Sequence, residues 1–191
     1  RTTTKTPRRA TMTSRNPTRA ATTRDDERSA RDERVGTIFG TMTLGWRYAS
    51  ETCDDETSTA MLRTFVRDGG GRRCRELDTA IAYAGGETER ILGRAFASDG
   101  TLRASDATVD TKANPWPGGV MTGDPGTGGL SARELRAQVR SSVESLNGKR
   151  IRTLYLHAPD SETRLEDALE ECERLRREEN AFEDVGLSNF S

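Results

Sequence analysis

Four polar residues stand at or just beyond the ends of three successive short apolar runs. Asp78 and Tyr83 lie in LDTAIAY, Lys112 lies in TVDTKANPW, and His157 follows TLYL. A phenol is a weak acid at neutral pH, but a lysine cation beside it favours the phenolate and makes the tyrosine a better proton donor. A carboxylate next to the lysine would keep that cation charged and in place. A histidine could then hydrogen-bond and orient a carbonyl oxygen.

These four groups together could donate a proton to a carbonyl that receives hydride from a cofactor. Each residue alone also has an ordinary structural explanation. Asp78 could cap a turn, and Tyr83 could pack in a loop. Lys112 could be a solvated strand end, and His157 could be a satisfied core histidine. The chemical interpretation therefore depends on the coincidence of all four residues at strand ends.

The elements that must position these residues alternate along the chain. Short apolar runs predict five strands, at residues 35–42, 74–80, 107–112, 151–157 and 182–187. Apolar side chains recur at helical spacing between them. They predict four helices, at residues 55–67, 87–96, 131–146 and 163–175. Ser131 and Thr163 each precede a glutamate by three residues, which is the pattern of a capping box.

Two of the expected helices have a clear apolar face. The helix at 55–67 is expected to bury Met61, Leu62, Phe65 and Val66. The helix at 87–96 is expected to bury Ile91, Leu92, Ala95 and Phe96. Both faces would pack against a sheet.

Alternating strands and helices predict a parallel α/β sheet. The repeat of roughly 35–40 residues is close to one unit of a (β/α)8 barrel, whose active sites lie at the carboxyl ends of the strands. Periodicity does not separate such a barrel from an open doubly wound sheet. No GxGxxG follows the first strand, which counts against the open sheet. The glycines at 69–71 are typical of a turn before a strand.

The composition limits which classes of protein this chain can belong to. The chain has 191 residues, of which 32% are hydrophobic and 32% charged, enough for one domain with its own core. No stretch approaches 18 consecutive apolar residues, so we expect no membrane span. The chain has an odd number of cysteines, and none are spaced as CxxC: they are Cys53, Cys74 and Cys172. We therefore expect neither a disulfide framework nor a metal site, and we expect a reducing compartment, the cytoplasm.

Residues 1–34 differ from the remainder of the chain. The first 24 residues contain seven basic residues and no acid, and large apolar side chains are almost absent from the segment. We expect a disordered tail at 1–34 and a barrel domain at 35–191. The tail also resembles a transit peptide, which would place the protein in an organelle, or untranslated sequence read as protein. The remainder is acidic overall, so we expect no nucleic-acid partner.

The motifs resemble those of the aldo-keto reductase superfamily, whose tetrad is Asp, Tyr, Lys and His, and most closely its aflatoxin-aldehyde reductase branch. Tyr83 follows Asp78 by five residues, and Lys112 follows Tyr83 by 29. The similarity covers about residues 35–191. The matching stretches are FGTMTLG at 39–45, LDTAIAY at 77–83, GETERILG at 86–93, TKANPW at 111–116, LYLHAPD at 154–160 and VGLSNFS at 185–191.

This resemblance implies a (β/α)8 barrel truncated after its fifth strand and, in the full-length form, NADPH-dependent reduction of aldehydes or ketones. The implied catalytic residues are Asp78, Tyr83, Lys112 and His157, with Tyr83 as the general acid. The implied cofactor-binding residues are Gly40, Thr41, Met42, Asp78, Ser188 and Asn189. Ser188 and Asn189 would bind the nicotinamide carboxamide. The implied substrate pocket contains Trp46, Tyr48 and Trp116.

Two other functions are compatible with the same motifs. One is a non-catalytic binding protein like the potassium-channel β-subunits, which resemble this superfamily and keep the tetrad. The other is an inactive remnant. TKANPW and LYLHAPD favour the enzyme, and the intact tetrad argues against the remnant. The expected partner of the enzyme is a small carbonyl substrate, and a homodimer is compatible with the full-length form.

Both ends of the chain look cut, since it starts at Arg1 and stops inside a strand-end motif at Ser191. In an eight-unit barrel of this superfamily, the last three units would carry the loops that bind the cofactor pyrophosphate. We therefore expect the 191 residues alone to bind NADPH poorly and to turn over little. The glycine-rich stretch at 117–129 could cover the substrate pocket, but we interpret it as a tolerated insertion.

Overall fold

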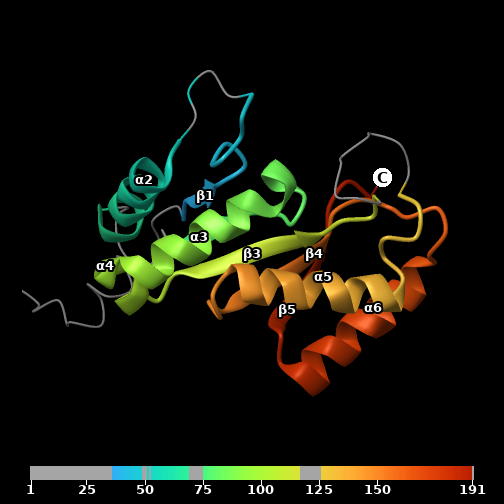
Figure 1. The fold of residues 1–191 in the computed structure, drawn as a ribbon. Helices are drawn as coiled ribbons and strands as arrows, with labels where there is room; N and C mark the ends of the chain where they lie inside the picture. Colours follow the sequence, from blue (N-terminus) through green and yellow to red (C-terminus); the bar gives the residue numbers. More distant parts are fainter. Residues whose placement is uncertain (1–35, 49–50, 52, 69–74, 117–125, 191) are drawn as a thin grey trace, which may run out of the picture. The chain divides into compact units, whose positions relative to one another are not determined.

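The structure is a computed structural model that describes residues 36–48, 51, 53–68, 75–116 and 126–190 (Figure 1). The expected tail at 1–34, the glycines at 69–71 and Cys74 lie outside the described residues. So do residues 117–125 of the glycine-rich stretch.

Five parallel strands form one sheet in the order β1-β2-β3-β4-β5. They are β1 Ile38–Gly40, β2 Glu76–Asp78, β3 Thr108–Ala113, β4 Ile151–Leu156 and β5 Phe182–Leu187. All five expected strands are present, and the fifth has the expected bounds. β1 and β2 are shorter than expected, with three residues each, because they pair only at those three positions.

The strand order distinguishes a (β/α)8 barrel from an open doubly wound sheet, which the periodicity of the sequence could not do. In a doubly wound sheet the order reverses at a switch point. Here every crossover leads to the next strand in the same direction, and because such crossovers are right-handed, a constant step puts all the helices on one face. Figure 1 shows α3 and α5 crossing in front of β3 and β4. The sheet is therefore part of a (β/α)8 barrel, as the sequence predicts.

The four expected helices are present. They are α2 Asp55–Asp68, α3 Glu87–Ser98, α5 Ala132–Ser145 and α6 Leu165–Arg174. The sequence did not predict three short elements, η1 Tyr83–Gly86, α4 Gly100–Ala104 and the π-helical turn η3 Leu175–Glu179. Among the helices that the structure describes, none is both long enough and apolar enough to cross a bilayer.

The two expected capping boxes do not form. Ser131 is the N-cap residue of α5, but its side chain makes no capping hydrogen bond. The N-cap of α6 is Arg164 instead of Thr163. Thr163 instead helps to lower the pKa of the Asp160 carboxyl, which lies three residues before it in the same loop.

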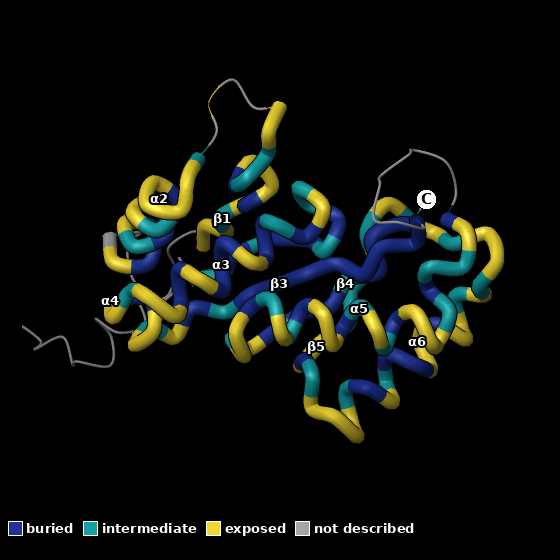
Figure 2. The backbone as a smooth tube through the Cα atoms, viewed as in Figure 1, coloured by how far each residue is buried: buried dark blue, intermediate teal, exposed yellow. Residues whose placement is uncertain are grey.

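The apolar core lies between the sheet and the helices, and β3 and β4 are buried along most of their length (Figure 2). The four residues expected to be buried in α3 are all buried. In α2, Leu62 and Val66 are buried and Phe65 is half-buried, but Met61 is 40% exposed, so its expected burial is wrong. Met61 precedes Leu62 by about 100° around the helix and falls outside the buried stripe.

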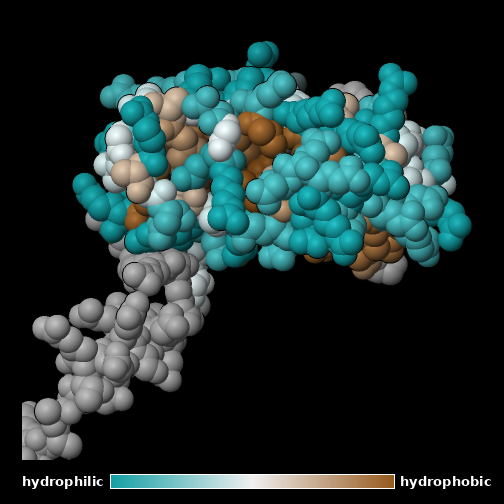
Figure 3. All heavy atoms as spheres, turned by 90° about the horizontal axis from the view of Figure 1, so that it is seen from below, coloured by the Kyte–Doolittle hydropathy of each residue, from teal (hydrophilic) through white to brown (hydrophobic). Residues whose placement is uncertain are grey.

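The surface is mostly hydrophilic, with apolar side chains showing between charged ones on the face seen in Figure 3. The large hydrophobic residues exposed over the described part of the chain are Ile38, Met42, Tyr48, Met61, Leu169 and Leu187. Scattered exposure of this kind is normal for a folded surface.

A buried carboxylate joins two helices, α3 and α5, to strand β3. Glu89 of α3 is fully buried and accepts hydrogen bonds from Thr111 of β3 at 2.6 Å and Ser142 of α5 at 3.2 Å. Burial raises the pKa of Glu89 above its usual value, although both hydroxyls oppose the shift. Gly93 lets the two helices meet closely, because a Cβ there would lie 2.0 Å from the Ser145 carbonyl oxygen.

We expect Glu89→Gln to raise the free energy of unfolding at pH 8 by about 1 kcal/mol and to change it little at pH 5. Since the pKa of Glu89 is raised in the folded state, its stabilising contribution is present below the unfolded pKa and is lost as the pH rises through the folded pKa. Glutamine does not ionise and removes that loss. Urea unfolding at the two pH values measures the difference. Glu170→Gln, on the exposed surface of α6, is the control. Equal effects of both substitutions at pH 8 would contradict the prediction.

Candidate active site

The structure brings the four predicted tetrad residues together at the carboxyl ends of β2, β3 and β4. Lys112 Nζ donates hydrogen bonds to Asp78 Oδ1 at 2.6 Å and to the Thr79 carbonyl at 2.8 Å. The same ammonium lies 5.4 Å from the centre of the Tyr83 ring. The rings of Tyr83 and His157 meet edge-on, with centroids 5.9 Å apart. Residues that lie far apart in the sequence thus form one cluster.

Tyr83 is held by a left-handed turn. It begins η1, and its backbone N–H donates to the Ala80 carbonyl at 3.0 Å. Ala84, Gly85 and Gly86 then all have positive φ, at 49°, 65° and 85°. Glycine adopts this conformation freely, whereas Ala84 is strained there. The sequence analysis missed this turn, and the GG pair after Tyr83 was the signal that could have revealed it.

His157 is buried in the cluster, with 3% of its surface exposed. Its Nδ1 atom has no hydrogen-bond partner within the part of the chain that the structure describes. Burial and, to a smaller extent, the Lys112 cation lower the pKa of His157 to about 4, and the Asp78 carboxylate opposes them. The imidazole is therefore neutral at pH 7. A buried nitrogen without a partner is costly, so this edge of the ring suits a polar ligand.

Trp116 is the predicted pocket residue that reaches the tetrad. Its ring meets the His157 ring edge-on at 5.6 Å, and it is 7% exposed. Asn114 fixes its backbone, since the amide Nδ2 donates to the Trp116 carbonyl at 3.0 Å and Oδ1 accepts from the Trp116 N–H at 3.1 Å. We had not predicted Asn114. The Asn-Pro pair in TKANPW, which favours turns closed by the asparagine side chain, was the available signal.

The other two predicted pocket aromatics, Trp46 and Tyr48, make no ring contact with the tetrad in the part of the chain that the structure describes. Tyr48 is 93% exposed. Trp46 is half-buried in the loop after β1, where its N–H donates to the Thr43 carbonyl at 3.3 Å. Among the described residues, neither ring stacks on a tetrad side chain.

The predicted cofactor residues lie at the ends of β1 and β5. Met42 is 42% exposed, and apart from its chain neighbours no atom of the described residues lies within 4 Å of the position that a Cβ on Gly40 would take. Thr41 differs, because it is fully buried and both its N–H and its hydroxyl donate to the Asp78 carbonyl, at 2.9 and 2.8 Å. Asn189 follows β5, and its Nδ2 donates to the His157 carbonyl at 2.8 Å and to Ser188 Oγ at 3.1 Å.

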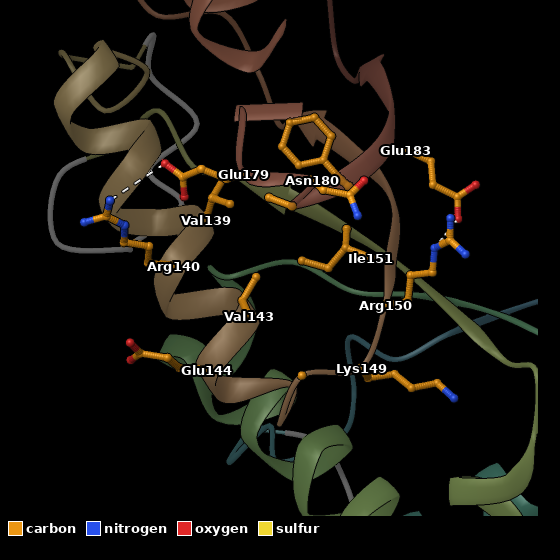
Figure 4. Close-up of a pocket in the computed structure, with 13 residues that line it drawn as sticks. Val139, Arg140, Val143, Glu144, Lys149, Arg150, Ile151, Glu179, Asn180 and Glu183 are labelled. Carbon is orange, nitrogen blue, oxygen red and sulfur yellow. Dashed lines mark ion pairs between the residues drawn. The ribbon is translucent and has the colours of Figure 1, made fainter. Parts of the chain in front are cut away.

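A separate groove lies at the opposite end of the sheet (Figure 4). It has a volume of about 570 Å³ and is lined by Ile151 and Phe182, which begin β4 and β5. Two ion pairs lie at the groove, Arg140 with Glu179 and Arg150 with Glu183. Since the tetrad lies at the carboxyl ends of the strands, this groove is remote from it. We therefore place the candidate site at the tetrad and not here.

Parallel strands in sequence order, with a polar cluster at their carboxyl ends, define a (β/α)8-barrel protein of the kind that places its site there. The family model described as "Aldo/keto reductase family" matches residues 37–191. The chain belongs to this family.

Individual relatives agree with that assignment. Aflatoxin B1 aldehyde reductase member 2 of Rattus norvegicus is 36% identical over 160 residues, covering 83% of this chain and 38% of the relative. Member 4 of Homo sapiens is 35% identical over 162 residues, covering 83% and 42%. The chain thus spans about two fifths of the length of these relatives. An aldo-keto reductase from Klebsiella pneumoniae in complex with NADPH superposes with a TM-score of 0.59 at 22% identity, covering 81% of this chain and 45% of that one, which shows the shared fold.

We expect the imidazole of His157 to titrate with a midpoint near pH 4, because burial and the Lys112 cation both oppose its protonation. NMR with ¹⁵N-labelled histidine measures this directly, and His157→Gln assigns the signal. Lys112→Met should raise the midpoint by removing the repelling cation. Since the pKa is lowered by folding, the contribution of His157 to stability is complete above pH 6.5 and is lost as the pH falls toward 4. A midpoint near 6.5 in the unaltered protein would contradict the prediction.

Proposed function

We propose that this protein, in its full-length form, reduces aldehydes or ketones to alcohols with NADPH. The observation that carries the proposal is the buried Lys112 ammonium, which is 2.6 Å from Asp78 Oδ1 and 5.4 Å from the Tyr83 ring centre. The names of the aldehyde reductases it resembles support the substrate class, and the Klebsiella pneumoniae structure with NADPH supports the cofactor.

Tyr83 would donate the proton to the carbonyl oxygen. Proton transfer leaves a phenolate, and the nearby Lys112 cation stabilises that negative charge. Asp78 fixes the direction of the lysine ammonium through the 2.6 Å hydrogen bond. The pair would therefore stabilise the negative charge that develops on the phenol oxygen in the transition state more than it stabilises the neutral phenol, which is the requirement for catalysis.

His157 would orient the carbonyl oxygen without competing as its acid. With a pKa of about 4, the imidazole is neutral at pH 7 and retains one N–H donor. Its buried position and the edge-on Trp116 ring exclude water from that side of the oxygen. A hydrogen bond in such a dry site positions the substrate more firmly than one exposed to solvent.

The residues at the strand ends fit a nicotinamide ring. When bound, the cofactor supplies the hydride. Gly40 leaves open space at the end of β1, and Met42 is exposed beside it, so a flat ring has room there. Ser188 and Asn189 would hold the carboxamide, since the Asn189 amide is already fixed by its bond to the His157 carbonyl. The buried Thr41 would support this surface from below through Asp78.

We expect Tyr83→Phe to lower the turnover of NADPH-dependent aldehyde reduction by about 10²–10⁴-fold, the usual contribution of a general acid. Cofactor affinity, measured by fluorescence titration with NADPH, should change by less than about threefold, since the phenol acts on the carbonyl. Tyr155→Phe is a matched control, because that ring lies 5.8 Å from the same Lys112 ammonium but belongs to β4. If both variants lost the same activity, Tyr83 would not be the specific donor. All variants are made in the full-length protein, and if that protein without substitutions reduced no carbonyl, the proposed function would fail.

A further inference from the structure

Residues 126–130, the described end of the glycine-rich stretch, connect the loop after β3 with the loop after β4. Thr127 and Gly129 both donate backbone N–H bonds to the Pro115 carbonyl, at 3.0 and 3.3 Å. On the other side, Gly126 accepts from the N–H and the hydroxyl of Ser161, each at 2.7 Å. The 126–130 segment is therefore packed into the structure between the two loops.

Two glycines make this contact sterically possible. A Cβ at Gly126 would lie 2.1 Å from the Pro115 Cβ, and one at Gly129 would lie 2.6 Å from the Asn114 carbonyl oxygen. Both distances are shorter than any real contact, so a side chain at either position would push the segment away. The sequence led us to expect a tolerated insertion, but such an insertion would not require the close packing that residues 126–130 show.

Asp160 fixes the segment from the loop after β4. Its Oδ1 accepts from the Gly128 N–H at 2.7 Å, and its Oδ2 accepts from the Leu130 N–H at 2.8 Å. A third N–H, of Glu162, donates to Oδ1 at 3.0 Å. Burial would raise the pKa of Asp160, but these donors outweigh it and lower the pKa. The carboxylate is therefore charged at neutral pH, and charge-assisted hydrogen bonds of this kind are strong.

The anchored segment in turn holds the loop that presents Trp116. Gln138 of α5 donates to the Gly129 carbonyl at 2.7 Å and to the Asn114 carbonyl at 3.0 Å. Its Oε1 also accepts from the Asn114 N–H at 2.7 Å. Since Asn114 holds both backbone groups of Trp116, a continuous set of hydrogen bonds runs from Asp160 to that residue.

We infer that Asp160 is a positioning residue for the carbonyl pocket: its carboxylate fixes the 126–130 segment on the loop after β3 and thereby sets the Trp116 ring against His157. Asp160 acts through the segment and not on the substrate. The consequence for catalysis rests on the proposed reductase function, whereas the consequence for the Trp116 ring does not. The test therefore measures both the position of the Trp116 ring and the kinetics of carbonyl reduction.

The position of the ring can be followed by ¹⁹F NMR of the full-length protein labelled with 5-fluorotryptophan, with the Trp116 signal assigned by Trp116→Phe. Asp160→Ala should shift and broaden the Trp116 signal. The Trp46 signal should stay in place, because that residue belongs to the loop after β1. Asp54→Ala is the matched control, since Asp54 also accepts a backbone N–H, from Thr57 at 2.7 Å, but at the start of α2. It should leave the Trp116 signal unchanged.

Kinetics supply the second measurement. Asp160→Ala should raise KM for an aldehyde about tenfold, because a displaced Trp116 ring would weaken the positioning of the substrate. The kcat should change by less than about threefold, and the affinity for NADPH should be unaltered. If Asp160→Ala unfolds, so that both fluorotryptophan signals collapse, the isosteric Asp160→Asn is measured instead and should shift only Trp116. An unchanged Trp116 signal in a folded Asp160 variant would overturn the inference. Absence of carbonyl reduction in the unaltered protein would overturn the proposed function alone, and the ¹⁹F result would still decide the role of Asp160.

Discussion

The Lys112 ammonium is 8% exposed, and a buried charge of this kind costs several kcal/mol unless it is paired. Asp78 and the Thr79 carbonyl supply the pairing from β2. The bond can form only if β2 and β3 keep their register, in which Asp78 lies opposite Asp110. The pairing of β2 with β3 therefore places this ammonium beside Tyr83, and the same cation adds to the effect of burial in lowering the pKa of His157.

A second ion cluster stabilises the same strands. Arg152 of β4 binds the buried Asp110 of β3 through two hydrogen bonds, at 3.1 and 2.6 Å, and pairs with Glu76 of β2 at 2.5 Å. Asp110 also accepts the Thr153 N–H at 3.0 Å, next to the register shift between β3 and β4. Because bidentate arginine pairs are geometrically specific, this cluster fixes the shift that brings Lys112 opposite Tyr155.

Features with a local period could be predicted, and features that depend on distant partners could not. The strands and helices could be predicted because the spacing of apolar residues indicates them. The tetrad could be predicted because the carboxyl ends of parallel strands lie at the same edge of the sheet. The Glu89 bonds join residues 22 and 53 positions apart, and the Asp160 bonds to Gly128 and Leu130 span 32 and 30. Such separations leave no local pattern. Thr163 shows that a local pattern can also mislead, because α6 begins one residue later than the pattern indicates, with Arg164 as its N-cap.

The position of Tyr83 depends on the helical layer as much as on the sheet. The strained Ala84 turn persists only if its surroundings hold it, and α3 begins directly after it. Thr88 in the first turn of α3 donates to the Leu44 carbonyl at 2.8 Å, and Glu89 binds Thr111 next to Lys112. The helix that follows Tyr83 is thus fixed to β3, the strand that carries Lys112. Movement of α3 would therefore change the distance between Tyr83 and Lys112, and a firmly anchored outer layer is a condition for the chemistry proposed for this pair.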